Sequence, residues 1–173
     1  MTILLEDVPQ FRWQTDLGRL LPAIRQQVEE LTWVISNLQC LHFGGLIPKV
    51  AAWEEQMEHY YSYTVVSGKT LYDAMADTDM QAVWGVFCGV AGSVPDLSKD
   101  EVPYADGNRE LWTEPESFQL AASEIEIVAF DSSFTLVRFR DESLSRQFLE
   151  AFPSGRIVQS PDDMLKSSQP YQQ

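Results

Sequence analysis

The sequence predicts an α+β fold, in which helices pack on one face of a mostly antiparallel sheet of five or six strands. Segments with apolar residues at helical spacing alternate with segments rich in β-branched and aromatic residues. Two strand-like segments near residue 130 are joined by a turn of three residues, which favours antiparallel pairing. The chain has 173 residues, 45% of them hydrophobic, which is enough to fill one core.

The predicted elements lie within one domain over residues 1–158, and we expect the polar tail over 159–173 to be disordered. The first fifteen residues are expected to form an extended lead-in. Pro22 places the first regular helix at about 22–31, because proline is tolerated in the first turn but not in a helix interior. The elements that follow are a strand at 32–41, a helix at 49–60, a strand at 61–66, a helix at 70–76 and a central strand at 81–90.

The best-specified element is a hairpin over 118–140, followed by a helix at about 142–152 that Asp141 caps. Opposite charges directly across a ladder contribute about 0.2–1 kcal/mol each. A shift by one residue would mix the buried and the exposed faces, so the charge pattern predicts the register. The predicted pairs across the hairpin are Phe130–Phe134, Val128–Leu136, Glu126–Arg138 and Glu124–Arg140. We expect the two charged pairs to have a structural role.

Negative charge is concentrated in the middle of the chain. The net charge is −14, and residues 51–126 hold 15 acidic and 3 basic side chains, a net charge of −12. Phosphate binding needs clustered Lys and Arg, so nucleic acid is a poor partner. An anionic membrane surface is disfavoured for the same reason, and no segment approaches the roughly 20 apolar residues that span a bilayer. The start of the chain lacks the pattern of a signal peptide, so we expect a cytoplasmic protein.

The densest part of this acidic region is the segment from Gly92 to Glu116, which we predict to be a long loop. Acidic and aromatic side chains together suit a basic protein surface, because aromatics supply contact area and carboxylates pair with Arg and Lys. A plain solvated loop and a calcium site at Asp106–Asn108 are the alternatives, although the regular calcium-loop spacing is missing. The candidate partner-binding residues are Asp96, Asp100, Glu101, Tyr104, Asp106, Glu110, Trp112, Glu114 and Glu116.

Motifs for catalysis or cofactors are weak, and we expect no catalytic residue, metal site or cofactor. Ser67 to Thr70 looks like the end of a phosphate-binding loop, but the position that needs the first glycine holds Tyr63. Glu55 and His59 have a spacing that could hold a metal, yet no further ligand lies nearby in the sequence. We expect Cys40 and Cys88 to be buried thiols of a reducing compartment.

These observations favour an acidic protein-binding module that masks a basic partner. In size, acidity and lack of catalytic motifs the chain is similar to bacterial immunity proteins, which neutralise a cognate toxin; the similarity is one of general character. The first alternative is a small enzyme or ligand-binding domain whose site assembles only in space, for example around Trp84, His42 or Tyr63. The second is a subunit of a larger assembly, which an exposed apolar patch would indicate.

Overall fold

The fold is built on one antiparallel sheet. The structure is a computed structural model and describes residues 1–42, 52–53, 62–76 and 79–166. Within these residues seven strands lie in the order β3-β2-β4-β5-β6-β1-β7, and every neighbouring pair is antiparallel. The predicted α+β class is confirmed, with more strands than expected. The strands are β1 (Thr2–Leu5), β2 (Thr32–His42), β3 (Tyr63–Ser67), β4 (Met80–Val90), β5 (Ser123–Phe130), β6 (Phe134–Phe139) and β7 (Arg156–Val158).

Strand β1 accounts for part of this difference. Its four residues were expected to belong to an extended lead-in, but they insert between β6 and β7, and all four are buried. The apolar run is short and ends at Glu6, so the local sequence gives little sign of a strand. Its place in the sheet comes from pairing with residues more than 130 positions away, such as Leu4 with Leu136.

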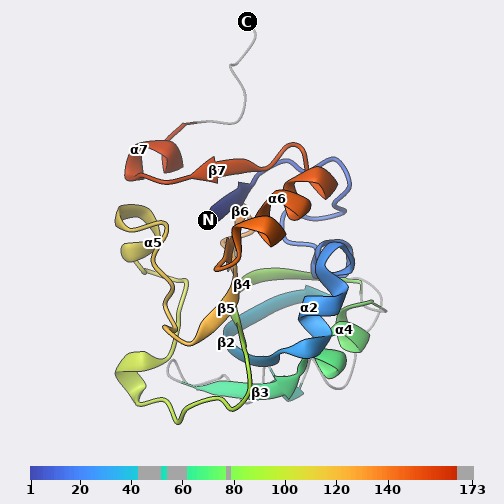
Figure 1. Cartoon of the computed structure of the whole chain (residues 1–173), viewed down its shortest axis with the longest axis vertical. Helices are drawn as coiled ribbons and strands as arrows, with labels where there is room; N and C mark the ends of the chain where they lie inside the picture. Colours follow the sequence, from blue (N-terminus) through green and yellow to red (C-terminus); the bar gives the residue numbers. More distant parts are fainter. Residues whose placement is uncertain (43–51, 54–61, 77–78, 167–173) are drawn as a thin grey trace, which may run out of the picture.

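The longer helices cover one face of the sheet, which we call the helix side (Figure 1). Their apolar side chains meet those of the sheet in one core that includes Val28, Trp33, Phe87, Ile127 and Phe148. Pro22 lies in the first turn of a short 3₁₀ helix, where a missing N–H is tolerated, and the regular helix predicted from about residue 22 begins only at Arg25. The helical elements here are α1 (Leu17–Leu20), η1 (Leu21–Ile24), α2 (Arg25–Glu30), α4 (Gly68–Ala76) and α6 (Glu142–Ala151).

Helix α4 begins against the end of α2, and this contact explains the Ser67–Thr70 motif. The Gly68 amide donates to the carbonyl of Leu31 at 2.9 Å. A Cβ at Gly68 would lie 1.7 Å from the carbonyl oxygen of Val28, so glycine is required for the close approach. The Ser67 hydroxyl accepts a hydrogen bond from the Thr70 amide at 3.2 Å. The motif therefore caps a packed helix.

A layer of irregular chain covers the opposite face, which we call the loop side (Figure 1). Residues 91–122 contribute η2 (Lys99–Glu101) and α5 (Glu110–Thr113), and α7 (Pro161–Met164) lies beside them. Leu111 and Met164 pack in a second core with Val34, Val86 and Leu136 of the sheet. Because α7 is ordered and Met164 is buried, the expectation of a disordered tail from residue 159 is wrong for 159–166. The remainder of that tail lies outside the described residues.

The hairpin has the predicted register, but only one of its two charged pairs is exposed: Glu124 and Arg140 lie at the surface, whereas Glu126 and Arg138 do not. Phe130 faces Phe134 and Glu126 faces Arg138, as the charge pattern indicated. Glu126 and Arg138 are both buried, with relative exposures of 0% and 1%. The reason is that the layer of residues 91–122 lies over them, which local sequence does not reveal.

The remaining elements agree with the predicted order where the structure describes them. Strand β4 is interior to the sheet, as predicted, and its pairing with β5 shifts register between Gly89 and Val90. Asp141 caps α6 through the amide of Ser143 at 2.7 Å. The helix predicted over 49–60 lies outside the described residues apart from Ala52 and Trp53. No helix among the described residues is long and apolar enough to cross a membrane.

Candidate functional site: the acidic layer

Residues 91–122, here named the acidic layer, contain every residue predicted to bind a partner. The part from Gly92 to Glu116 was expected to be a long loop, and the hairpin was expected to begin at 118, whereas β5 begins at Ser123. In the structure the backbone of the acidic layer is held onto the sheet at several points by polar side chains that rise from the loop side.

Strand β2 supplies the first set of these contacts. The Ser36 hydroxyl donates to the carbonyl of Pro103 at 2.7 Å. The Asn37 side-chain oxygen accepts from the amides of Ala105 and Asp106 at 3.0 and 3.3 Å. Asn37 has a φ of 52°, a conformation that asparagine tolerates better than most residues, and it lies where β2 and β4 shift register. An irregularity in β2 therefore turns an amide side chain toward the layer.

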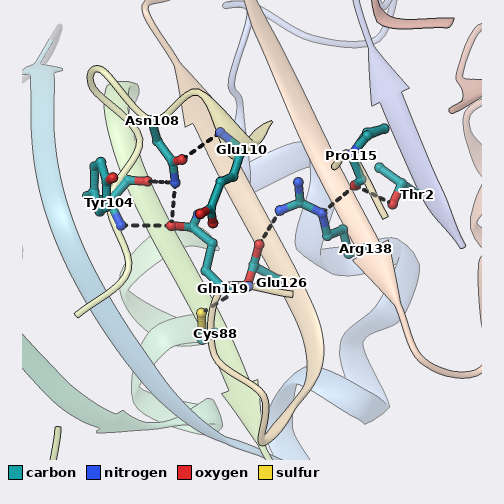
Figure 2. A network of polar contacts seen from close by, with 9 residues as sticks. All are labelled: Thr2, Cys88, Tyr104, Asn108, Glu110, Pro115, Gln119, Glu126 and Arg138. Carbon is teal, nitrogen blue, oxygen red and sulfur yellow. Dashed lines mark hydrogen bonds and ion pairs between the residues drawn. The ribbon is translucent and has the colours of Figure 1, made fainter. Parts of the chain in front are cut away.

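The Glu126–Arg138 ion pair supplies the second set (Figure 2). Arg138 Nη1 donates to Glu126 Oε1 across the β5–β6 ladder. Arg138 Nε donates to the carbonyl of Pro115 at 2.7 Å, and the Thr2 hydroxyl donates to the same carbonyl at 2.9 Å. Glu126 Oε2 accepts from the backbone amide of Gln119 at 2.8 Å. Each member of the pair thus bonds both within the sheet and to the layer, and Glu126 also accepts from the Cys88 thiol of β4.

Gln119 links the early part of the layer, residues 104–110, to its later part, residues 115–119 (Figure 2). Its side-chain oxygen accepts from the Tyr104 amide at 3.0 Å and from Asn108 Nδ2 at 2.9 Å. Asn108 Nδ2 also donates to the Tyr104 carbonyl at 3.0 Å, and its oxygen accepts from the Glu110 amide at 3.0 Å. A continuous set of hydrogen bonds therefore runs from the buried ion pair to residues 104–110.

Arg140 holds the end of the layer in a different way from Arg138. Its Nε donates to the carbonyl of Ser123 and its Nη2 to that of Ala121, both at 2.8 Å. The guanidinium also lies over the ring of Phe118, 4.6 Å from the ring centroid. The Arg140 amide bonds to the Glu124 carbonyl, so the predicted pairing of residues holds, but the Arg140 side chain bonds to backbone carbonyls.

Aromatic rings fasten α5 to the sheet. Trp112 meets the rings of Phe130 and Phe134 edge to face, with centroids 5.5 and 5.4 Å apart. Trp84 of β4 meets Phe130 in the same manner at 4.8 Å. Trp112 was predicted to offer contact area to a partner, and the structure instead uses much of its surface inside the fold. It is half-buried, while Tyr104 remains 38% exposed.

The acidic residues of the layer lie at its surface. All seven acidic residues predicted as partner-binding are exposed. Glu101 accepts from the hydroxyl and the amide of Ser98 in a capping box, and these hydrogen bonds lower the pKa of Glu101. Within the described part of the chain six of the seven take part in no ion pair. These six are Asp96, Asp100, Glu101, Glu110, Glu114 and Glu116.

Sequence reasoning missed the residues that place the layer. Ser36, Asn37, Glu126 and Arg138 were not site candidates, and Glu126 and Arg138 were expected to be structural pairs. A signal existed, because the polar residues 36–37 directly follow the apolar run Trp33 to Ile35. The sequence could not show what those side chains bond to, because Pro103 and Ala105 lie more than 65 residues away.

In the described residues, the other side chains considered for catalysis or metal binding do not come together in one site. Cys88 is a buried free thiol that donates to Glu126 at 3.7 Å. Burial raises the pKa of Cys88, and the Glu126 charge adds to this effect, so the thiolate is disfavoured. Tyr63 and Trp84, named for a spatially assembled site, are engaged by Leu97 and Phe130. Within the residues described, no cluster of three or more His, Cys, Asp or Glu could hold a metal ion.

Two surface hollows lie on the helix side, away from the acidic layer. One of about 160 Å³ lies between α2, β5 and α6, with Leu31, Ile125 and Leu144 as its apolar residues. Another of about 490 Å³ includes Arg19 and Phe152. Neither contains a residue that the sequence singled out for catalysis.

Comparison with known proteins identifies no relative of the chain. No family model, no curated protein and no solved structure matches the chain. Its function is therefore argued from the described geometry.

Proposed function

We propose that the chain is an acidic protein-binding module that masks a basic partner, in the manner of a toxin-neutralising immunity protein. The observation that carries the proposal is that exposed carboxylates without ion-pair partners stand on a segment whose backbone is fastened to the sheet. Residues 91–122 contain seven acidic and two basic side chains, so the segment has a net charge of −5. A surface of one sign attracts a partner of the opposite sign and speeds its association.

The fastened backbone strengthens the proposal. A mobile acidic loop would lose conformational entropy on binding, whereas a segment already held in one conformation loses less. Hydrogen bonds hold the backbone of the layer at two places, at Pro103 and Ala105 and at Pro115 and Gln119. Carboxylates such as Glu110 and Glu114 therefore keep their relative positions before a partner arrives.

The test compares two variants that change the net charge equally on different faces. The chain is used as bait to capture a basic protein, and the Kd of that protein is then measured for each variant. The layer variant carries Asp106→Asn, Glu110→Gln, Glu114→Gln and Glu116→Gln. The control variant carries Glu30→Gln, Asp73→Asn, Glu142→Gln and Glu150→Gln on the helix side.

We expect the layer variant to bind about tenfold or more weakly, because each exposed ion pair contributes about 0.2–1 kcal/mol and four are removed. Its affinity should also depend less on salt concentration. The control variant should bind within about threefold of the unmodified chain, through the small change in the overall field. Equal weakening by both variants, or capture of no basic protein, would contradict the proposal.

A further inference from the structure

We propose that the buried Glu126–Arg138 pair is a positioning device for the acidic layer, and that Gln119 passes its effect to residues 104–110. Only the consequence for partner binding rests on the proposed function. The positioning role rests on the contacts themselves.

Each member of the pair contacts both the sheet and the layer, and Glu126 has one further sheet contact, with the Cys88 thiol. Arg138 uses Nη1 for Glu126 and Nε for the Pro115 carbonyl. Glu126 uses Oε1 for Arg138 and Oε2 for the Gln119 amide. Pro115 is buried, and a buried carbonyl needs a hydrogen-bond partner. An apolar pair would fill the same space between β5 and β6 but could bond to neither atom of the layer.

This division distinguishes positioning from simple stabilisation. Replacing a buried ion pair by apolar residues of similar volume is often neutral or stabilising for a fold. A purely structural pair could therefore be exchanged for apolar residues without consequence. A positioning pair could not, because Pro115 would keep only the Thr2 hydroxyl and the Gln119 amide would lose its acceptor.

Gln119 extends the effect because its backbone and its side chain face different partners. The backbone amide is held by Glu126, while the side-chain oxygen holds the Tyr104 amide and Asn108. Asn108 in turn accepts from the Glu110 amide, so an exposed carboxylate of the layer is placed three contacts from the ion pair. Figure 2 shows these residues as one connected network.

The first test is the double variant Glu126→Leu with Arg138→Met, which leaves the net charge unchanged. Amide hydrogen exchange is measured residue by residue, together with the melting temperature. We expect the Gln119 amide to exchange about tenfold faster or more, because it loses a hydrogen bond to a charged group. Amides of the sheet core, such as those of Val86 and Val128, should keep their protection. An unchanged rate at Gln119 in the folded variant would overturn the proposal.

The second test keeps both buried charges, so it does not depend on whether the first variant folds. In Gln119→Ala the backbone amide of residue 119 still reaches Glu126, but the side-chain acceptor is lost. The amides of Tyr104 and Glu110 should exchange about tenfold faster, while that of residue 119 stays protected. Unchanged exchange at Tyr104 and Glu110 would overturn the role of Gln119.

A binding measurement then separates this proposal from the proposed function. With a captured basic protein, the double variant should bind at least threefold more weakly although its exposed carboxylates and net charge are intact. Unchanged affinity, together with faster exchange at Gln119, would show that the layer is positioned for another purpose and would overturn the link to binding. Failure to capture a basic protein would remove the proposed function and leave the exchange results as the measure of positioning.

Discussion

The two faces of the sheet are covered by different means. On the helix side, apolar side chains such as Val28, Trp33 and Phe148 meet in a continuous core. On the loop side, an apolar core is also present, but the covering chain is fastened in addition by hydrogen bonds from Ser36, Asn37 and the Glu126–Arg138 pair. A helix satisfies its own backbone and needs only an apolar face, whereas irregular chain needs partners for its amides and carbonyls.

The two faces also differ in how their exposed acidic residues are paired with bases. Several acids of the helix side pair with bases of their own helix, as in Arg25–Glu29, Lys69–Asp73 and Arg146–Glu142. The acidic layer has only Lys99 and Arg109 as bases, and six of its acids form no ion pair within the described residues. Charge on the helix side is therefore partly balanced within its own helices, whereas most carboxylates of the acidic layer have no basic partner in the described residues.

The contrast between the two faces predicts that the largest loss of stability follows substitution of Arg138 on the loop side. The variant Arg138→Ala leaves Glu126 as a buried charge without its partner and removes a donor from Pro115. We expect a loss of about 3–5 kcal/mol in the free energy of unfolding, measured by urea denaturation. Glu124→Ala is the matched control, because Glu124 lies two residues from Glu126 along β5 but is exposed, and it should cost less than about 0.5 kcal/mol. Similar losses for the two variants would contradict the burial of the pair.

A second variant tests the helix side, where backbones approach closely. Gly68→Ala would place a methyl group 1.7 Å from the Val28 carbonyl oxygen, which belongs to the backbone and cannot rotate away. We expect a loss of about 2–3 kcal/mol in the free energy of unfolding, since α4 must move from α2. Thermal denaturation measures this, and hydrogen exchange in the acidic layer should not change. A rise in stability, as alanine usually brings to a helix, would show that the two helices are not in contact at this point.

The sequence predicted the local parts of both faces better than their assembly. The hairpin register followed from four charges and a short turn, and the Asp141 cap and Pro22 position followed from local chemistry. The burial of Glu126 could not be predicted in this way. It depends on the layer of residues 91–122, whose mixture of proline, glycine and acids has no periodicity that would place it on the sheet.

The candidate site shows the same limit. Composition alone identified Asp96 to Glu116 as an exposed acidic segment, and the structure places those carboxylates on the surface. The contacts that fix the segment join Pro103 to Ser36 and Pro115 to Thr2, which are 67 and 113 residues apart. Trp112 illustrates the converse, because an aromatic residue that looked available for a partner packs on Phe130 and Phe134.

The smallest expected effect is the pH dependence of stability. One capping carboxylate on each face contributes to it. Hydrogen bonds from Ser98 lower the pKa of Glu101 on the loop side below 4.5, and those from Ser143 lower the pKa of Asp141 on the helix side below 3.8. A carboxylate whose pKa is lower in the folded state stabilises the fold above its unfolded pKa and loses that contribution as the pH falls through the folded value. Stability should therefore be constant with respect to these groups above about pH 5 and decline below about pH 4.

Ser98→Ala and Ser143→Ala separate the two contributions, and carbon-detected NMR titration of each carboxyl group reads them directly. In Ser98→Ala the pKa of Glu101 should rise toward 4.5 while that of Asp141 stays low, and Ser143→Ala should give the reverse. Because both carboxylates are exposed, the change in stability should be small on either face. If Ser98→Ala shifted both carboxyl groups, the caps would be coupled across the sheet, and the two faces could no longer be treated as independent coverings of one scaffold.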